Sequence, residues 1–303
     1  MMGAGHGHGA AGHAGGRHRW RLAVTFVLVF AFFLVELVFG LMSNSLALIS
    51  DAGHMSADVV ALGAALVATR IATRLDTTGR KTYGSYRAEV FASGFTVLIM
   101  LGVAAYVVIE AISRIGDAPE VATGTMLVVG ALGLVVNIVS MLLLREGSRE
   151  SLNVKGAYYE VVADAAGSVG VIAAGILVAV SGQPIWDTLV AVAIGIFVAV
   201  RAVVLGRQVL AVLGQHVPEG IVVDEVVETL EALPGVAGVH DLHLWTLTSG
   251  MNVATAHLVV EKGSDGQLVL TKAQGVLATA YGIEHATLQT ELAPTQQCEE
   301  VSW

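Results

Sequence analysis

The sequence has little cysteine and little charge. Its single cysteine, Cys298, cannot form a disulfide within the chain, which excludes a disulfide scaffold and is compatible with a reducing compartment. Asp, Glu, Lys and Arg together make up only 14% of the residues, whereas about 25% is typical of soluble domains. An ordinary soluble globular protein of this length is therefore excluded.

Apolar residues take the place of the missing charges. Hydrophobic residues make up 55% of the chain, the mean hydropathy is +0.73, and the 35 glycines suit helices that pack closely in lipid. Runs of about 20 apolar residues, each long enough to cross a bilayer as a helix, lie at 21–43, 46–70, 88–113, 121–144, 157–181 and 185–206. The first run is too long for a signal-peptide core. The sequence predicts an α-helical membrane protein with six transmembrane helices in residues 20–207.

The loops between these runs indicate how the chain is oriented. Basic residues precede the first run, lie in the second-to-third and fourth-to-fifth loops, and follow the sixth run at Arg207, whereas the alternate loops hold one basic residue, Arg114. By the positive-inside rule, both termini are expected on the cytoplasmic side of the cell (inner or plasma) membrane.

The last third of the chain differs in charge and in period. Residues 208–303 hold twelve acids and two lysines, which argues against nucleic acid as a partner because that role needs a basic surface. "VVDEVVETLEAL" and "DGQLVLTKAQGVLATAY" have helical periodicity, whereas "VAGVHDLHLWTLTS", "NVATAHLVVE" and "EHATLQTEL" read as strands. The order αββαβ predicts a small ferredoxin-like or heavy-metal-associated-like α/β domain over 208–296, with two helices on one face of a three-stranded sheet and a tail at 297–303.

The N-terminus is a Gly/Ala/His tract. Residues 1–19 lack apolar periodicity and are expected to be disordered. Their histidines, which could capture metal weakly, are His6, His8, His13 and His18.

Two apolar runs carry ionisable residues with the same spacing. The second run contains His54 and Asp58, and the fifth contains Glu160 and Asp164. Residues four apart lie on nearly the same helix face, so the two faces could bring four ligands together around Zn²⁺ or a related divalent ion. The alternative is a structural cluster of polar residues paired within the bundle.

Charge balance favours a cation at this place. A charged residue at the centre of a span costs roughly 2.5–3.5 kcal/mol. Neither of these two runs carries Lys or Arg next to the four residues, so we expect a bound cation, a proton or a water-filled cavity to hold them. Asp51, three residues before His54, either supports the ligands from behind or caps the start of the helix. Glu36 and Asn137 are interpreted as hydrogen-bond partners between helices.

Several segments together resemble the cation diffusion facilitator family of metal/proton antiporters, most of which transport zinc. These segments are "SNSLALISDAGHMSADVVALGAAL", "YGSYRAEV", "NVKGAYYEVVADAAGSVGVI" and "LPGVAGVHDLHLWTLTSG". The resemblance implies a homodimer whose cytoplasmic domain binds metal and takes part in dimerisation. It also implies a transport site made of His54, Asp58, Glu160 and Asp164.

Glu160 departs from the family pattern, which usually has His at this position. A third carboxylate makes the site harder and favours Mn²⁺, whereas His54 favours Zn²⁺, Co²⁺ or Cd²⁺. We expect Zn²⁺ first, with Mn²⁺ or Co²⁺/Cd²⁺ as alternatives. Three carboxylates exceed the charge of a divalent ion by one, so the loaded site is also expected to retain a proton.

The resemblance also predicts a metal site in the C-terminal domain, where Zn²⁺ would be a regulatory ligand as well as the substrate. His240, His257 and His285 match positions at which relatives bind metal, with Asp241 and Glu291 as oxygen ligands. Strand alternation would place His240 and His243 on opposite faces of the sheet, so that only one of them could join a given site.

These features predict that the chain exports divalent metal ions from the cytoplasm in exchange for protons by alternating access. Protonation would release the metal, because the ligands must be deprotonated to bind it. A membrane metalloenzyme would need a motif such as His-Glu-x-x-His, which the sequence lacks, so we expect a transporter and not an enzyme. A non-transporting metal receptor stays open as a further alternative.

Overall fold

The computed structural model describes residues 19–72, 82–115, 119–146, 152–248 and 250–292. Of the predicted N-terminal tract, residues 1–19, only Arg19 is among the described residues. The predicted tail, residues 297–303, lies outside them. The chain divides into two compact units, which meet at Val67/Ala68, Phe91/Ala92 and Leu205/Gly206.

The first unit is a helical bundle. Its helices are α2 (Arg19–Ser43), α3 (Leu46–Ala72), α4 (Ala88–Ser113), α5 (Thr123–Leu144), α6 (Leu152–Ser181) and α7 (Ile185–Leu213). Among the described residues, five of these helices are long and apolar enough to cross a membrane, the exception being α3. At 1.5 Å per residue the 27 residues of α3 extend about 40 Å, which is long enough to cross a bilayer. A helical membrane domain is thus confirmed.

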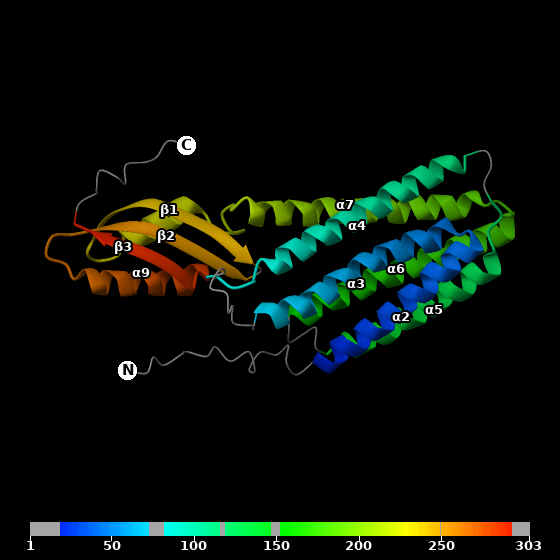
Figure 1. The fold of residues 1–303 in the computed structure, drawn as a ribbon, viewed down its shortest axis with the longest axis horizontal. Coiled ribbons are helices and arrows are strands. Elements are labelled where there is room, and N and C mark those ends of the chain that lie inside the picture. The colour runs from blue at the N-terminus through cyan, green and yellow to red at the C-terminus, as the bar shows by residue number, and fades with distance from the viewer. Residues whose placement is uncertain (1–18, 73–81, 116–118, 147–151, 249, 293–303) are drawn as a thin grey trace. The chain divides into compact units, whose positions relative to one another are not determined.

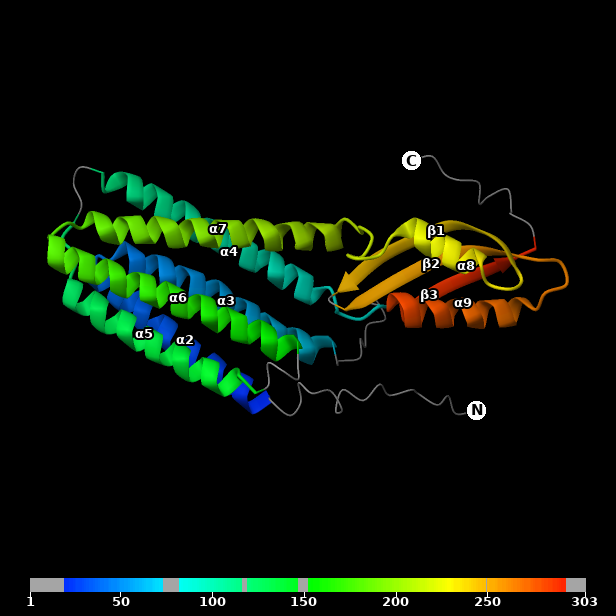
Figure 2. The ribbon, with the colours of Figure 1, turned by 180° about the vertical axis from the view of Figure 1, so that it is seen from behind.

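Small residues let the helices of the bundle approach one another closely (Figures 1 and 2). A Cβ at Gly133 of α5 would lie 2.6 Å from Phe32 of α2 and 2.9 Å from Ser168 of α6. A Cβ at Gly53 of α3 would overlap a methyl group of Val103 on α4. These glycines let α2, α5 and α6, and likewise α3 and α4, come into close contact at these positions.

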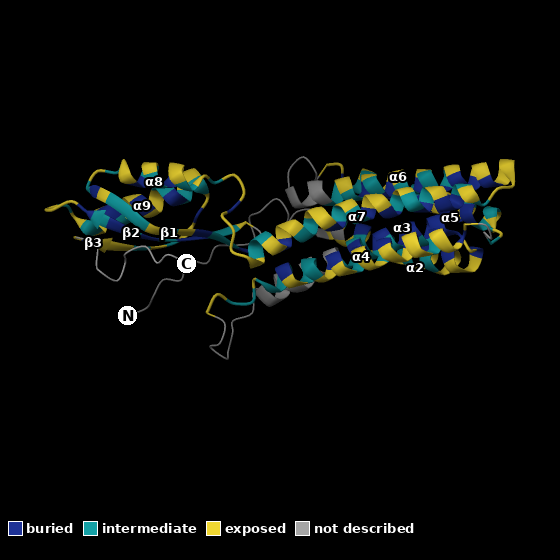
Figure 3. Cartoon of the chain, turned by 90° about the horizontal axis from the view of Figure 1, so that it is seen from above, coloured by how far each residue is buried: buried dark blue, intermediate teal, exposed yellow. Residues whose placement is uncertain are grey.

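The outer surface of the bundle is apolar. Figure 3 shows exposed residues along the helices, and large hydrophobic side chains such as Val27, Leu98, Ile109 and Val180 are 62–83% exposed. Exposed apolar surface of this extent is unusual for a soluble monomer and is what lipid contact requires.

The second unit contains a small α/β domain. It consists of α8 (Val223–Glu231), β1 (Val236–Thr248), β2 (Met251–Val260), α9 (Gly266–Tyr281) and β3 (His285–Glu291). The sheet order is β1-β2-β3, with β1 antiparallel and β3 parallel to β2. Val226 and Leu230 of α8 and Leu277 of α9 pack into one core with Leu244 and Leu258 of the sheet, and both helices lie on the same side of the sheet (Figure 3). The predicted αββαβ domain is confirmed.

Candidate functional site

Three of the four predicted transport ligands converge between α3 and α6. Nε2 of His54 lies 3.5 Å from Oδ1 of Asp164, and Nδ1 of His54 lies 3.8 Å from Oδ2 of Asp58. One ligand atom from each of these residues falls within 4.8 Å of the others. We call His54, Asp58 and Asp164 the membrane trio.

The membrane trio is buried and underpaired. His54 and Asp164 are each 2% exposed, and Asp58 is only partly exposed. Nδ1 of His54, Oδ2 of Asp58 and Oδ1 of Asp164 have no hydrogen-bond partner among the described residues. Burying polar atoms without partners is costly, and a coordinated divalent cation would satisfy all three atoms at once. The donor set therefore fits a metal ion.

Glu160, the fourth predicted ligand, has a different neighbour. Its two carboxylate oxygens each lie 2.6 Å from Nη2 of Arg201 on α7. The same nitrogen lies 3.9 Å from Asp58, and Nη1 lies 3.2 Å from Nε2 of His54. The expectation that only a bound cation, a proton or water could balance these carboxylates is wrong, because a third helix supplies a guanidinium. In the sequence, the sign of this guanidinium is Arg201, an arginine inside the apolar run 185–206.

Asp51 lies on α3 with His54 and Asp58 but has no described hydrogen bond to the membrane trio. It is 1% exposed, its Oδ1 has no hydrogen-bond partner among the described residues, and it faces Gly167 of α6, where a Cβ would overlap Oδ1. The capping interpretation is wrong, because α3 begins at Leu46, five residues earlier. Support of the ligands by Asp51 stays a prediction.

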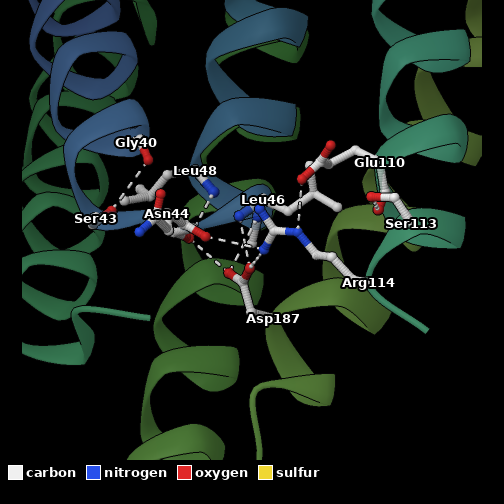
Figure 4. Close-up of polar contacts among 11 residues, drawn as sticks. Gly40, Ser43, Asn44, Leu46, Leu48, Glu110, Ser113, Arg114 and Asp187 are labelled. Atoms are coloured by element: carbon white, nitrogen blue, oxygen red, sulfur yellow. Dashed lines mark hydrogen bonds and ion pairs between the residues drawn. The ribbon is translucent and has the colours of Figure 1, made fainter. Parts of the chain in front are cut away.

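The start of α3 is capped by an aspartate from α7, which the sequence analysis did not single out (Figure 4). The backbone N–H groups of Leu46 and Ala47 donate to the Asp187 carboxylate at 2.6 and 3.2 Å. The Ser45 hydroxyl donates to the same carboxylate at 2.6 Å, and Arg114, the residue that follows α4, lies 3.4 Å from it. A carboxylate at a helix N-terminus satisfies orphan donors and complements the helix dipole. Asp187 thereby joins α3, α4 and α7 at one end.

The two remaining polar predictions in the bundle have different outcomes. The Asn137 side-chain amide donates to Ser168 at 3.3 Å, which confirms a hydrogen bond between α5 and α6. Glu36 is 1% exposed and lies within hydrogen-bond reach of Asp51 on α3, to which it can bond when one of the two carboxyl groups carries a proton. The interpretation of Glu36 as an interhelical hydrogen-bond partner stays a prediction, with Asp51 as the partner.

A second group of candidate ligands lies on the sheet of the C-terminal domain. Nδ1 of His257 lies 2.8 Å from Oε1 of Glu291, and Nε2 of His240 lies 3.3 Å from Oε2 of the same residue. The two imidazole ring centroids are 5.1 Å apart. We call His240, His257 and Glu291 the sheet trio, because one ligand atom from each lies within 4.8 Å of the others.

The charge of Glu291 suits a cation at the sheet trio. Burial acts to raise the pKa of this carboxyl group, but the positive charges of His257 and His240 and the hydrogen bonds from His240 and Gln289 outweigh it. The pKa of Glu291 therefore lies below its ordinary value. The carboxylate therefore stays ionised at neutral pH and can bind a cation.

A β-bulge at Asp241 changes which histidines share a face. His240 pairs with His257 and His243 pairs with Thr255, so three residues of β1 span two residues of β2. Asp241 absorbs the extra residue with φ +54°, a left-handed conformation that Asp adopts more readily than most residues. The prediction that His240 and His243 lie on opposite faces of the sheet is wrong. Their partners His257 and Thr255 are two residues apart on β2, so the extra residue in β1 places both histidines on the same face. His243 contacts Asp241 at 2.9 Å.

The structure does not bring His285 to the sheet trio. His285 pairs with Val253, four residues along β2 from His257, which is about 13 Å at the rise of a strand. Asp241 is nearer, with Oδ2 3.9 Å from Nε2 of His257. Among the predicted ligands of this domain, Asp241 is therefore positioned at the margin of the site, and His285 is at the other end of the sheet.

Two family models match this chain. Residues 22–213 match the family model of the cation efflux transmembrane domain, and residues 218–293 match that of the cation efflux protein cytoplasmic domain. The first match ends near the end of α7, and the second covers the whole α/β domain.

Individual relatives match along nearly the whole chain. The metal cation efflux system protein CzcD of Cupriavidus metallidurans is 43% identical, over 98% of this chain and 93% of that protein. A cadmium, cobalt and zinc/H(+)-K(+) antiporter of Bacillus velezensis is 35% identical, over 95% and 92%. The zinc transporter ZitB of Pectobacterium atrosepticum is 34% identical, over 92% and 87%. The chain therefore belongs to the cation efflux family, the cation diffusion facilitators that its motifs resemble.

Proposed function

We propose that this chain exports Zn²⁺ from the cytoplasm in exchange for protons, through a transport site formed by His54, Asp58, Glu160 and Asp164. The observation that carries the proposal is the membrane trio, which is buried between two membrane helices and has one unpartnered ligand atom on each residue. Family membership supports metal cation efflux and a transporter in place of an enzyme.

The choice of Zn²⁺ rests on the ligands and on the relatives. One imidazole among carboxylates suits a borderline ion, for which Zn²⁺, Co²⁺ and Cd²⁺ are candidates. The names of the relatives include cadmium, cobalt and zinc, which supports these ions over Mn²⁺. Zn²⁺ comes first because the trio offers three ligands in the space that a four-coordinate ion requires.

Exchange with protons follows from the ligand chemistry. Asp58, Asp164 and His54 each bind either a proton or a metal ion, so a proton that enters from the outer side competes with the metal for the same atoms. Alternating access would expose the trio to one side at a time. The name of the Bacillus relative adds K⁺ to the exchanged ions, and the assay must therefore separate a proton gradient from a K⁺ gradient.

The test is flux in proteoliposomes loaded with a zinc-sensitive dye, with the proton and K⁺ gradients imposed separately. Asp58→Asn and Asp164→Asn keep the side-chain shape and remove the charge, so we expect both to abolish Zn²⁺ flux. Asp224→Asn, which removes an exposed carboxylate from α8, is the matched control and should transport like wild type. Wild-type flux in a folded Asp58→Asn protein would refute the site, and equal flux without a proton gradient would refute proton exchange.

Selectivity is measured in the same vesicles with Zn²⁺, Cd²⁺, Co²⁺ and Mn²⁺. We expect Zn²⁺ to give the highest ratio of kcat to KM and Mn²⁺ the lowest. A higher ratio for Mn²⁺ would show that the carboxylates, and not His54, set the preference. A protein that binds Zn²⁺ without any flux would instead be the metal receptor.

We further propose that the sheet trio binds Zn²⁺ as a regulatory ligand. Two imidazoles and an ionised carboxylate form three of the four positions of a typical zinc site, and Asp241 lies within reach as an oxygen ligand. Both chain termini and this domain would lie on the cytoplasmic side of the cell membrane. The partners are then cytoplasmic metal ions, protons, lipid and a second copy of the chain.

A further inference from the structure

Arg201 lies within the apolar helix α7, yet its guanidinium reaches candidate ligands on both α3 and α6. Nη2 lies 2.6 Å from each carboxylate oxygen of Glu160, and Nη1 lies 3.2 Å from Nε2 of His54. The guanidinium carbon is 5.8 Å from the ring centroid of Phe197, which also meets the edge of the His54 ring. These contacts hold the Arg201 side chain against the candidate metal ligands, which indicates that Arg201 takes part in the transport site.

The formal charges balance only when Arg201 is counted. Asp58, Glu160 and Asp164 carry three negative charges when they are ionised, and a divalent ion cancels two of them. Arg201 supplies the third positive charge, so the loaded site is neutral without any retained proton. This changes the expectation drawn from the sequence, in which the excess charge required a proton.

The pair of Glu160 and Arg201 also explains the departure from the family pattern. A neutral histidine at position 160 would bring no charge to the site. Glu160 with Arg201 is neutral as a pair, because one negative and one positive charge lie 2.6 Å apart. The substitution of Glu for His on α6 is thus matched by a cation on α7.

Arg201 and a metal ion need the same atoms of the transport site. A guanidinium has donors and no acceptor, so its contact with Nε2 of His54 uses the lone pair of that nitrogen. A neutral imidazole has only one nitrogen lone pair, so while Nε2 accepts from Arg201, Nδ1 carries the proton and cannot bind a metal ion. Arg201 also lies 3.9 Å from Oδ1 of Asp58. A metal ion that binds His54 through either nitrogen must therefore displace the guanidinium from Nε2.

We propose that Arg201 is an internal counter-cation of the transport site: it neutralises Glu160 and competes with the metal ion for His54 and Asp58. The inference rests on the proposed function, because it requires the four residues to be the transport site. Arg201 acts through these residues and is a positioning residue. It lowers the metal affinity and helps the ion to leave after the site opens to the outer side.

A double-mutant cycle on the full chain tests the proposal, with Zn²⁺ as the probe. Arg201→Met removes the charge and keeps a long apolar stem, whereas Glu160→His introduces the residue of the family pattern. The measurements are equilibrium Zn²⁺ binding by calorimetry in detergent and Zn²⁺ flux in proteoliposomes. Arg207→Met, which removes an exposed cation from the same helix, is the matched control.

The proposal fixes an order of affinities. We expect Arg201→Met to bind Zn²⁺ about tenfold more tightly with a lower maximal flux, and Glu160→His to bind about tenfold more weakly because the guanidinium is left unpaired. In the double variant Glu160→His/Arg201→Met no guanidinium is left unpaired, so the loss of affinity caused by Glu160→His should vanish. Its Zn²⁺ affinity should then match that of Arg201→Met, about tenfold above the wild-type affinity that simple addition of the two effects would give. If Arg201→Met does not fold, Arg201→Gln takes its place in the cycle.

Two outcomes overturn the inference. In the first, Glu160→His binds Zn²⁺ as tightly as wild type. In the second, the effects of the two single variants simply add in the double variant. Failure of the proposed function itself looks different, because Asp58→Asn would then keep wild-type flux. If Asp58→Asn loses flux but the effects in the cycle are additive, the proposed transport site stands and the proposed role of Arg201 is refuted.

Discussion

The carboxylate of Asp187 at the start of α7 accepts the backbone N–H of Leu46, the first residue of α3, at 2.6 Å. Asp187 is fully buried, and Ser45 and Arg114 bind the same carboxylate. The relationship fixes the helix that carries His54 and Asp58 to the helix that carries Arg201. The site residues therefore depend on a contact made eight residues earlier along α3.

Asp187→Ala should destabilise the chain by about 3–5 kcal/mol, because it leaves Arg114 and two backbone donors without their carboxylate. The change is measured as a loss of thermal stability of the full chain in detergent. Glu110→Gln, which changes another contact of Arg114 and leaves the helix cap intact, should have a much smaller effect. Equal losses in the two variants would show that the cap does not stabilise α3.

The position of Gly53, next to His54, is expected to have no room for a larger residue. A Cβ there would overlap Cγ1 of Val103 and lie 3.1 Å from Cγ2, and a β-branched side chain in a helix has almost no alternative rotamer. Gly53→Ala should therefore destabilise the bundle by about 1–3 kcal/mol and reduce Zn²⁺ flux. The measurements are melting temperature in detergent and flux in proteoliposomes.

Two variants control for the helix propensity of alanine. Gly102→Ala on α4 meets nothing within 4 Å and should be neutral or stabilising by up to about 1 kcal/mol. Val103→Ala combined with Gly53→Ala should restore flux, because it removes the overlapping methyl groups. If Gly53→Ala behaves like Gly102→Ala, the close approach of α3 and α4 is not needed for transport.

The sheet trio and His285 should respond differently to substitution. We expect His240→Ala and Glu291→Gln each to weaken Zn²⁺ binding at the C-terminal domain by at least about tenfold, since each removes a ligand. His285→Ala should leave binding unchanged. Calorimetry is done on the full chain carrying Asp58→Asn. This substitution removes a ligand of the membrane trio, so the measured Zn²⁺ binding is that of the sheet trio. A loss of affinity in His285→Ala would mean that the histidine reaches the ion by a rearrangement of β3.

Two substitutions of Asp241 distinguish its role in the backbone of the bulge from its role as a metal ligand. Asp241→Gly should keep the bulge, because glycine adopts a positive φ at no cost, and should weaken Zn²⁺ binding only if the carboxylate is a ligand. Asp241→Val should destabilise the domain by about 1–2 kcal/mol, because a β-branched residue is strained at φ +54°. Equal melting temperatures for the two variants would show that the bulge is not under this constraint.

Much of the fold could be predicted from local patterns in the sequence. Apolar runs long enough to span a bilayer predict the helices, since backbone groups in lipid must be satisfied within the segment. The alternation around His257 and the periodicity of residues 266–281 predict the αββαβ domain. The pairs His54/Asp58 and Glu160/Asp164 could be placed on helix faces for the same reason, because a helix repeats every 3.6 residues.

Other features depend on contacts between distant residues. A one-residue bulge at Asp241 shifts His243 to the face of His240, and no local pattern marks that extra residue. The register of β3 against β2 separates His285 from His257, although both matched the expected pattern. β3 pairs in parallel with β2 after the crossover helix α9, so no tight turn between the two strands fixes their register.

The sequence by itself determined the class of the protein, the helices, and which residues could bind a metal ion, because these follow from composition and from the repeat of each element. Only the tertiary structure decided that Arg201 pairs with Glu160 and that Asp187 caps α3. Those contacts join residues 41 and about 140 positions apart in the chain. Their energies depend on distance and burial in three dimensions, which spacing along a sequence does not encode.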